Sequence, residues 1–206
     1  MIVRSVMIED VTTVAPDTPV RQAFELIETK HFDCLPVRDE HRHLVGVIQL
    51  TDIYEACMRL GRDAALALPV RDVMVSTPVT VSPEDVVERA AALMREHDVP
   101  LLPVVEHGEL VGIITESDIF QAFQEMLGAA TGTGRLTLVV PDRRGALARI
   151  AEIIRDEGIS ITHVATFYSK LFHQYKIVIR VETQAVEELA DVLDQHGYKV
   201  IHKTVD

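Results

Sequence analysis

The sequence contains no tryptophan, and aromatic residues make up only 5% of its 206 residues. Aromatic cages for bases or sugars are therefore not expected. Only two cysteines are present, Cys34 and Cys57, and their spacing fits neither a metal site nor a redox motif, so we expect reduced packing residues. No apolar run approaches the roughly 18 residues that a membrane-spanning helix requires.

Positive charge is also scarce, at 20 Lys and Arg against 32 Asp and Glu, for a net charge of −12. Nucleic-acid binding needs a basic face, and adhesion to an anionic membrane needs basic segments. We therefore expect neither a nucleic acid nor a membrane as partner. Residues 1–5 contain no apolar signal core, so a cytoplasmic protein is expected. The hydrophobic content of 48% is sufficient for packed cores.

Charge is divided unequally along the chain. Residues 1–133 hold 10 basic and 22 acidic residues, whereas residues 134–206 hold 10 of each. The change falls in the small, glycine-rich stretch Leu127–Gly134, which is typical of a flexible linker. Composition therefore predicts two parts, joined by a linker at 128–134.

The first part contains an internal duplication. Val70–Met74 repeats the Val-Met pattern of Val3–Met7 at a distance of 67 residues, and the Leu-Pro-Val sequence at Leu35 recurs at Leu102. After a gap of one residue, Leu110–Ile114 repeats Leu44–Ile48. A repeated unit of this kind predicts two copies that pack on each other. We place the copies at 1–60 and 68–127.

Each copy has the pattern β-α-β-β-α. In the first copy we expect strands at 12–14, 35–37 and 44–48, and in the second a first strand at 79–81. Thr18-Pro19 and Ser82-Pro83 each supply an N-cap hydroxyl followed by proline at the first helical position. The helices that follow have helical apolar spacing. Their apolar residues are Val20, Ala23, Phe24 and Ile27, and Val87, Ala90, Ala91 and Met94.

The second part, 135–206, has the order β-α-β-β-α-β of a ferredoxin-like fold. We expect strands at 136–140, 159–167, 175–181 and 198–203 and helices at 146–157 and 185–195. Gly158 is expected to end the first helix in the left-handed conformation. The predicted buried face of that helix consists of Leu147, Ile150, Ile153 and Ile154.

The most informative local pattern is the run from Gly112 to Asp118, Gly-Ile-Ile-Thr-Glu-Ser-Asp, where a strand ends and a helix begins. Thr115 and Asp118 have the spacing of a capping box, which satisfies free N–H groups of the helix. The same corner can also bind a ribose, because a carboxylate accepts hydrogen bonds from two neighbouring hydroxyls and a helix N-terminus tolerates a phosphate. Spacing alone leaves both interpretations open.

The duplicated unit, with its Val-Met opening, Leu-Pro-Val strand and Gly-hydrophobic-Ile-Thr-x-x-Asp corner, resembles a tandem of CBS motifs, a Bateman module. The resemblance implies an adenosine derivative, such as AMP or S-adenosylmethionine, as ligand. It implies that Asp118 holds the ribose hydroxyls and that Thr115 bonds to the ribose or the first phosphate. The base would lie against residues of the same copy: Thr77, Val79, Thr80, Val99, Pro100 and Leu101.

The first copy departs from this pattern, because Gln49 stands where the threonine is expected, although Asp52 is kept. We expect a weaker or empty site there, at Thr12, Phe32, Asp33, Gln49 and Asp52. No cation precedes the Leu-Pro-Val strand of either copy, and Asp33 would repel a phosphate. AMP or a weakly charged adenosyl compound is therefore expected to bind better than ATP.

The second part, with its Asp142-x-x-Gly145-x-Leu147 turn, resembles an ACT domain. ACT domains bind amino acids at a dimer interface. The resemblance therefore implies an effector site at Asp142, Gly145, Ala146, Ser160 and Ile161. The alternative is a module that only pairs subunits. In either case a homodimer is expected, with two such domains joined into one larger sheet.

Two CBS motifs followed by one ACT domain resemble the acetoin-utilisation protein AcuB family, which suggests a role linked to acetoin or acetate metabolism. No Ser-His-Asp, Cys-His or metal-ligand arrangement has a signature in the sequence. We therefore expect a mixed α/β (α+β) protein that acts as a non-catalytic sensor and needs no cofactor or metal. The alternative is a structural or regulatory subunit that binds a partner enzyme and no nucleotide.

Overall fold

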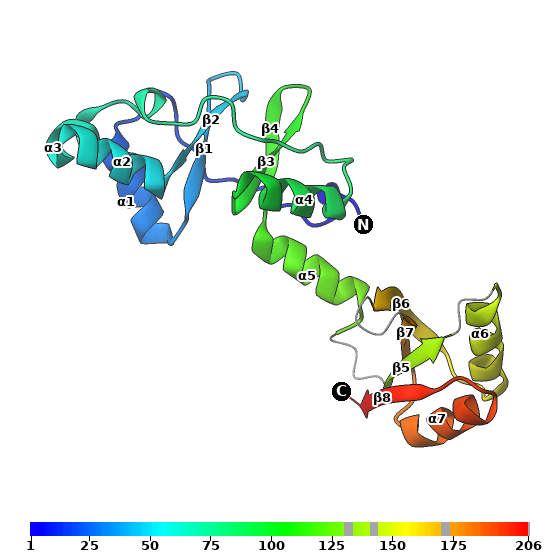
Figure 1. Cartoon of the computed structure of the whole chain (residues 1–206). Coiled ribbons are helices and arrows are strands. Elements are labelled where there is room, and N and C mark those ends of the chain that lie inside the picture. The colour runs from blue at the N-terminus through cyan, green and yellow to red at the C-terminus, as the bar shows by residue number, and fades with distance from the viewer. Residues whose placement is uncertain (130–133, 141–143, 170–173, 206) are drawn as a thin grey trace. The chain divides into compact units, whose positions relative to one another are not determined.

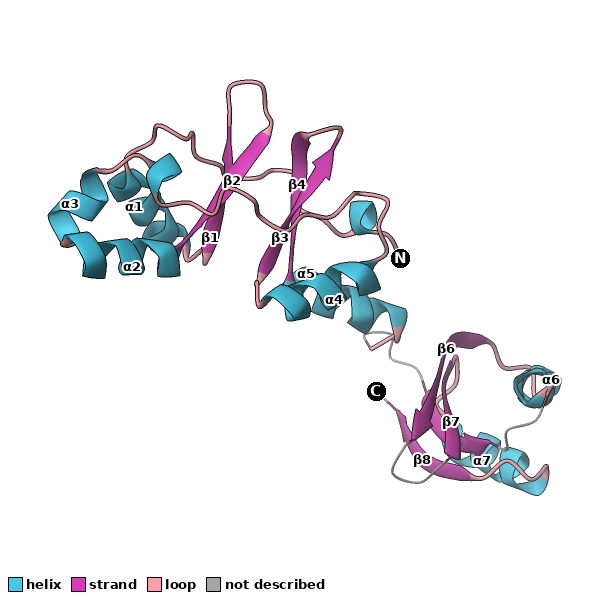
Figure 2. Cartoon of the chain, turned by 45° about the horizontal axis from the view of Figure 1, so that its top comes forward, coloured by secondary structure: helices cyan, strands magenta, loops and turns pink. Residues whose placement is uncertain are grey.

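The computed structural model describes residues 1–129, 134–140, 144–169 and 174–205 (Figure 1). The chain separates into two compact units, Met1–Ala122 and Phe123–Asp206. Both contain helices and antiparallel strands, which confirms the mixed α/β fold class (Figure 2). The predicted linker at 128–134 lies in part, at 130–133, outside the described residues.

The first copy of the repeat folds as one helix, a hairpin and a second helix. Helix α1 (Val20–Lys30) is followed by β1 (Cys34–Arg38), β2 (Leu44–Gln49) and α2 (Leu50–Leu60). The two strands are antiparallel. A short helix that the sequence did not predict, α3 (Arg62–Ala67), comes next. The predicted order is thus confirmed from the first helix onward, with α3 as an additional element.

The second copy has the same helix, hairpin and helix, without a counterpart of α3 among the described residues. Its elements are α4 (Val87–His97), β3 (Leu101–Glu106), β4 (Glu109–Thr115) and α5 (Glu116–Met126). The expected strands at 12–14 and 79–81 are reduced to single parallel bridges, from Val14 to Val37 and from Val81 to Val104. These bridges attach each segment to the first strand of its own copy.

The predicted helix starts are wrong. Helix α1 begins at Val20 after Pro19, and the Thr18 hydroxyl instead accepts a hydrogen bond from the N–H of Ala15 at 3.1 Å. Helix α4 begins at Val87, because the residues from Ser82 form a turn in which the Ser82 N–H donates to Asp85 at 2.8 Å. The Ser82 hydroxyl also accepts a hydrogen bond from the Glu84 N–H at 3.3 Å, so in both copies the hydroxyl stabilises the turn that precedes the helix.

The apolar faces of α1 and α4 are buried as predicted at three positions each. The buried side chains are Val20, Ala23 and Ile27, and Val87, Ala90 and Met94. Phe24 is only partly buried, packed against the core of the first copy. Helical periodicity therefore identifies the core-facing stripe correctly, except at its margin.

The segments that open the two copies are exchanged. The Val3 N–H donates to Asp85 O at 2.8 Å, and Ile8 pairs with Ile113 of β4, so the opening of the first copy packs on the second. Reciprocally, Val75 pairs with Val47 of β2. Neither copy is therefore complete without the other.

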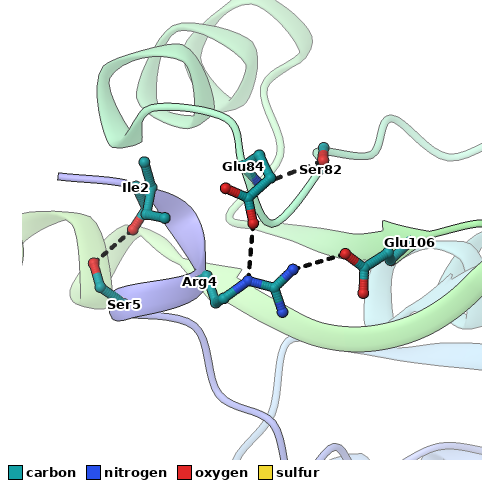
Figure 3. A network of polar contacts seen from close by, with 6 residues as sticks. All are labelled: Ile2, Arg4, Ser5, Ser82, Glu84 and Glu106. Carbon is teal, nitrogen blue, oxygen red and sulfur yellow. Dashed lines mark hydrogen bonds and ion pairs between the residues drawn. The ribbon is translucent and has the colours of Figure 1, made fainter.

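Ion pairs accompany this exchange. The Arg4 guanidinium donates to Glu84 at 2.9 Å and to Glu106 at 2.7 Å, as Figure 3 shows beside the Ser5 and Ser82 contacts. Arg71, 67 residues later, pairs with Asp17 on the first copy. Because these side chains are exposed, the pairs contribute little to the stability of the fold.

The second unit is a four-stranded antiparallel sheet with strand order β6-β7-β5-β8, the ferredoxin-like arrangement. Its elements are β5 (Gly134–Val140), α6 (Ala146–Asp156), β6 (Ile161–Ser169), β7 (Gln174–Val181), α7 (Val186–Gln195) and β8 (Val200–Val205). Gly158 has a φ of +73°, as predicted. The prediction that Leu147 is buried is wrong, because it is 42% exposed and Ala146 takes its place. None of the described helices is long and apolar enough to cross a membrane.

Candidate functional site

A cavity of about 310 Å³ lies within the first unit and is lined by both copies of the repeat. The first copy contributes residues before α1 and around the start of β1, and the second copy contributes the end of β4 and the start of α5. The lining residues are Ile8, Asp10, Thr12, His31, Phe32, Asp33, Cys34, Leu35, Pro36, Pro100, Leu101, Ile113, Thr115, Glu116 and Ser117.

The exchange of the opening segments explains why one cavity uses both copies. Ile8 pairs with Ile113 on β4, while Val14, six residues later, pairs with Val37 on β1. The intervening residues, including Asp10 and Thr12, therefore bridge the two hairpins and form part of the cavity wall.

The corner at the start of α5 is a capping box. The Thr115 N–H and hydroxyl both donate to Asp118 Oδ2, at 2.8 and 2.7 Å, and the Asp118 N–H donates to Thr115 Oγ1 at 3.3 Å. Within the described part of the chain, the other carboxylate oxygen, Asp118 Oδ1, has no protein partner. Capping thus leaves one oxygen of Asp118 able to accept further hydrogen bonds.

The corresponding corner of the first copy is also capped, although it lacks a hydroxyl. The Gln49 N–H donates to Asp52 Oδ2 at 2.9 Å, and the Gln49 side chain completes the capping box. Burial raises the pKa of the Asp52 carboxyl, and the neighbouring charge of Glu55 adds to this effect. The glutamine amide therefore replaces the threonine hydroxyl as a cap.

The residues predicted for two separate sites, one in each copy, do not form two separate sites in the structure. Thr12, Phe32 and Asp33, expected in the first-copy site, line the same cavity as Pro100, Leu101 and Thr115, expected in the second-copy site. Asp118 is not among the lining residues, but it accepts a hydrogen bond from the hydroxyl of Thr115, which is. The remaining predicted residues do not line this cavity: Thr77, Val79, Thr80, Val99, Gln49 and Asp52.

Several lining residues were not predicted from the sequence, notably Ile8, Asp10, His31 and Glu116. The repeat offered one available signal for them. The opening segments recur 67 residues apart, so each segment could pack on the other copy instead of its own. Such an exchange would place residues 8–12 beside the Thr115–Asp118 corner of the second copy.

The cavity is lined by acidic residues. Asp10, Asp33 and Glu116 contribute carboxylates, and no Lys or Arg is among the lining residues. Within the described residues, none of these three carboxylates has a hydrogen bond or ion pair. Their uncompensated charge makes the cavity unfavourable for a phosphate and favourable for a neutral or cationic group.

The cysteines are free, and Cys34 lies at the cavity wall. Burial raises the pKa of the Cys34 thiol to about 12, helped by the charges of Asp33 and Asp52. The thiol is therefore protonated and unreactive at neutral pH. Within the described ranges, no group of three or more His, Cys, Asp or Glu is arranged to hold a metal ion.

The predicted effector residues of the second unit lie at the start of α6 and of β6. Gly145 is the N-cap of α6 with a φ of +82°, and Ala146 after it is buried. Ser160 O accepts a hydrogen bond from Glu182 N–H at 3.0 Å, and Ile161 begins β6 opposite Val181. Asp142 lies outside the described residues.

Comparison with known sequences finds relatives of this chain. The chain is 30% identical to the CBS domain-containing protein YhcV of Bacillus subtilis over 131 residues, 64% of this chain and 90% of that protein. It is 32% identical to an inosine-5'-monophosphate dehydrogenase of Korarchaeum cryptofilum over 173 residues, which are 81% of this chain. The match spans only 33% of that dehydrogenase, about a third of its length.

Solved structures resemble the first part. CBSX2 in complex with AMP is 31% identical, with a TM-score of 0.55, and the match covers 60% of this chain and 96% of that one. CBSX2 is a protein of Arabidopsis thaliana. The AcuB protein of Vibrio cholerae, assigned to acetoin utilization, is 26% identical with a TM-score of 0.55, covering 61% of this chain and 91% of that one.

Family models match most of the chain. The CBS domain matches residues 3–59 and 70–125, which contain the two copies of the repeat, and the ACT domain matches residues 134–197. The chain therefore belongs to the CBS-domain family, as a pair of CBS motifs followed by an ACT domain.

Proposed function

We propose that this protein is a non-catalytic ligand sensor whose CBS pair binds an adenosine derivative in the cavity between the two copies. The observation that carries the proposal is the composition of the cavity, which combines lining residues of both copies with the N-terminus of α5 at Thr115 and Glu116. The AMP complex of CBSX2, a relative of 31% identity, supports the choice of ligand.

The Thr115–Asp118 corner would bind the ribose. Asp118 Oδ2 is engaged in capping, while Oδ1 is able to accept a hydroxyl hydrogen bond from the sugar. Phe32, 37% exposed, and Pro100 supply apolar surface in the same cavity for the base. The cap and the ligand would therefore use different oxygens of one carboxylate.

The acidic lining would select the ligand by charge. A triphosphate would bring several negative charges toward Asp10, Asp33 and Glu116, whereas adenosine brings none. We therefore expect adenosine or a cationic adenosyl compound to bind most tightly, AMP less tightly, and ATP least.

A ligand in this cavity would change how the two copies pack, because it contacts both. It can shift this packing only by the difference between its affinities for the two arrangements. The sensor would therefore report ligand concentration as a change in the relative populations of two states of the CBS pair, in a role linked to acetoin or acetate metabolism.

The ACT domain would assemble the homodimer through the edge strand β6. This strand has nine residues and, among the described residues, no neighbouring strand on one side, and it exposes Val164, Phe167 and Tyr168 by 41%, 47% and 46%. An exposed, long and apolar edge strand is a template for pairing with another strand. Pairing of β6 with its symmetry mate would extend the sheet, and an amino-acid effector at Gly145 and Ser160 would lie on the same unit.

The test is calorimetric titration of the full chain with adenosine, AMP and ATP, comparing the Asp118→Ala variant with Asp52→Ala. Asp52 has the matched capping position in the other copy and does not line the cavity. We expect Asp118→Ala to lose adenosine binding and Asp52→Ala to retain it. If neither adenosine nor AMP binds the unmodified protein, the alternative of a partner-enzyme subunit that binds no nucleotide takes its place.

A further inference from the structure

A second cavity, of about 370 Å³, lies in the first copy among helices α1, α2 and α3. It shares no lining residue with the cavity proposed for the adenosine derivative. Its wall includes Phe24 and Glu28 from α1, Tyr54 and Cys57 from α2, and Arg62 and Leu66 from α3.

Helix α3, on one side of this cavity, is anchored to the first copy by buried side chains and backbone contacts. Ala65 and Leu66 are 0% and 3% exposed, and Leu68 O, just after the helix, accepts a hydrogen bond from Val20 N–H at 2.8 Å. Pro69 also forms a bridge with Pro19 at the start of α1. Helix α3, which forms one wall of the cavity, is therefore packed into the fold rather than loosely connected to it.

The second copy does not have this arrangement. Residues equivalent by the repeat are Ala91 in place of Phe24 and Phe123 in place of Cys57. Within the described residues, α5 is followed by a turn at 127–129 instead of a helix like α3. The small Cys57 side chain and helix α3 thus form walls of the cavity in the first copy, and the described part of the second copy has neither.

The cavity combines an apolar wall with two opposite charges. Phe24 and Tyr54 meet edge to face, with ring centroids 6.3 Å apart, and Leu66 is buried beside them. Glu28 and Arg62 both line the cavity, yet within the described part of the chain neither forms an ion pair or a side-chain hydrogen bond. A carboxylate and a guanidinium are thus both available beside one apolar surface.

We propose that this cavity binds a free α-amino acid with an apolar side chain. The Arg62 guanidinium fork matches a carboxylate, the Glu28 carboxylate accepts hydrogen bonds from an ammonium group, and the aromatic pair packs against the side chain. Known ligand cavities begin at about 300 Å³, so this cavity suits a small molecule rather than a peptide. A zwitterionic amino acid carries both a carboxylate for Arg62 and an ammonium group for Glu28.

Calorimetric titration of the full chain with L-leucine and L-phenylalanine tests the proposal. The analogues 3-methylbutylamine and 4-methylpentanoate each carry one of the two charges and are expected to bind about tenfold or more weakly, as expected when a charge-assisted hydrogen bond is lost. Arg62→Gln and Glu28→Gln are expected to weaken leucine and phenylalanine binding by a similar factor. Arg21→Gln and Glu25→Gln, exposed on α1 and outside the cavity, serve as matched controls that retain binding.

Cys57→Phe provides an independent variant, because it places in the first copy the residue that the second copy has at the equivalent position. It is expected to fill the cavity and abolish amino-acid binding. Asp118→Ala is expected to leave this binding unchanged. The proposal is overturned if neither amino acid binds the unmodified protein, or if binding survives unchanged in both Arg62→Gln and Glu28→Gln, whose exposed side chains leave the fold intact.

Discussion

Met74 packs against Gly46 so closely that a Cβ on the glycine would lie 2.5 Å from Met74 Sδ and 2.8 Å from Val75 O. The same contact recurs between the copies at Met7 and Gly112, where the Cβ would lie 2.9 Å from Sδ and 3.0 Å from Ile8 O. These contacts are the points at which each exchanged segment meets the other copy. The absence of a side chain at both glycines is therefore a condition for the exchange.

Replacing either glycine is expected to destabilise the first unit. Gly46→Ala should lower the free energy of unfolding by about 1–3 kcal/mol, as overpacking in a well-packed region does. Gly112→Ala should cost less, because its contacts are longer. Urea unfolding of both variants measures the difference. Equal stability of Gly46→Ala and the unmodified protein would contradict the packing described here.

A matched control separates the two contacts of Gly46. In the Met74→Ala background, Gly46→Ala should destabilise by a smaller amount, since the sulfur contact is gone while Val75 O remains. Purely additive effects of Met74→Ala and Gly46→Ala would show that the methyl group added by Gly46→Ala does not interact with the Met74 side chain.

Removing acidic charge from the proposed adenosine site should favour phosphorylated ligands. Asp33→Asn and Glu116→Gln each take one carboxylate from the cavity wall. Weaker repulsion should raise the affinity for AMP by about two- to tenfold, while the affinity for adenosine changes little. Calorimetry at low and high salt measures both affinities. A larger gain for adenosine than for AMP would contradict charge selection.

The buried thiol of Cys34 predicts a loss of stability at high pH. Its pKa is raised to about 12 by burial, against an ordinary value of 9.0, so the unfolded chain releases the proton at a lower pH than the folded chain. The free energy of unfolding should therefore fall as pH rises from about 9 toward 12, with a slope of up to about 1.4 kcal/mol per pH unit from this group.

Cys34→Ala isolates this contribution, because other groups titrate equally in both proteins. The difference in unfolding free energy between Cys34→Ala and the unmodified protein should be constant below pH 9 and change above it. A thiol-specific reagent at pH 8 should leave Cys34 unmodified in the folded protein. Rapid labelling of Cys34 under these conditions would show that the thiol is neither buried nor protonated.

The proposed β6 interface predicts that a charge on this edge dissociates the dimer. Val164→Lys places an ammonium group on the exposed edge strand, where charged side chains oppose strand pairing. Ile201→Lys, at a position of similar exposure on the opposite edge strand β8, is the matched control. Sedimentation velocity should find monomers for Val164→Lys and dimers for Ile201→Lys. The reverse result would place the interface on β8.

Local patterns in the sequence predicted most of the secondary structure and the buried faces of helices α1 and α4. They could do so because periodicity indicates which side of an element is buried. They failed where tertiary contacts decide. Thr18 turns back to Ala15 instead of capping α1, and Leu147 lies at the exposed margin of α6. The short helix α3 has too few residues to show a period.

The site was predicted in parts rather than as a whole. The Thr115–Asp118 spacing offered the capping box as one of two interpretations, and the resemblance to CBS motifs named six residues that line the cavity. The sequence could not assign them to one cavity, because the pairing of Ile8 with Ile113 is a contact between copies that no local spacing encodes.

A crystal structure of the full chain with adenosine is the decisive experiment for the proposed site. We expect adenosine in the cavity between the copies, with its ribose hydroxyls on Asp118 Oδ1 and Thr115 and its base beside Phe32 and Pro100. Adenosine bound elsewhere on the chain, or a ribose that makes no contact with the Thr115–Asp118 corner, would refute the proposed site.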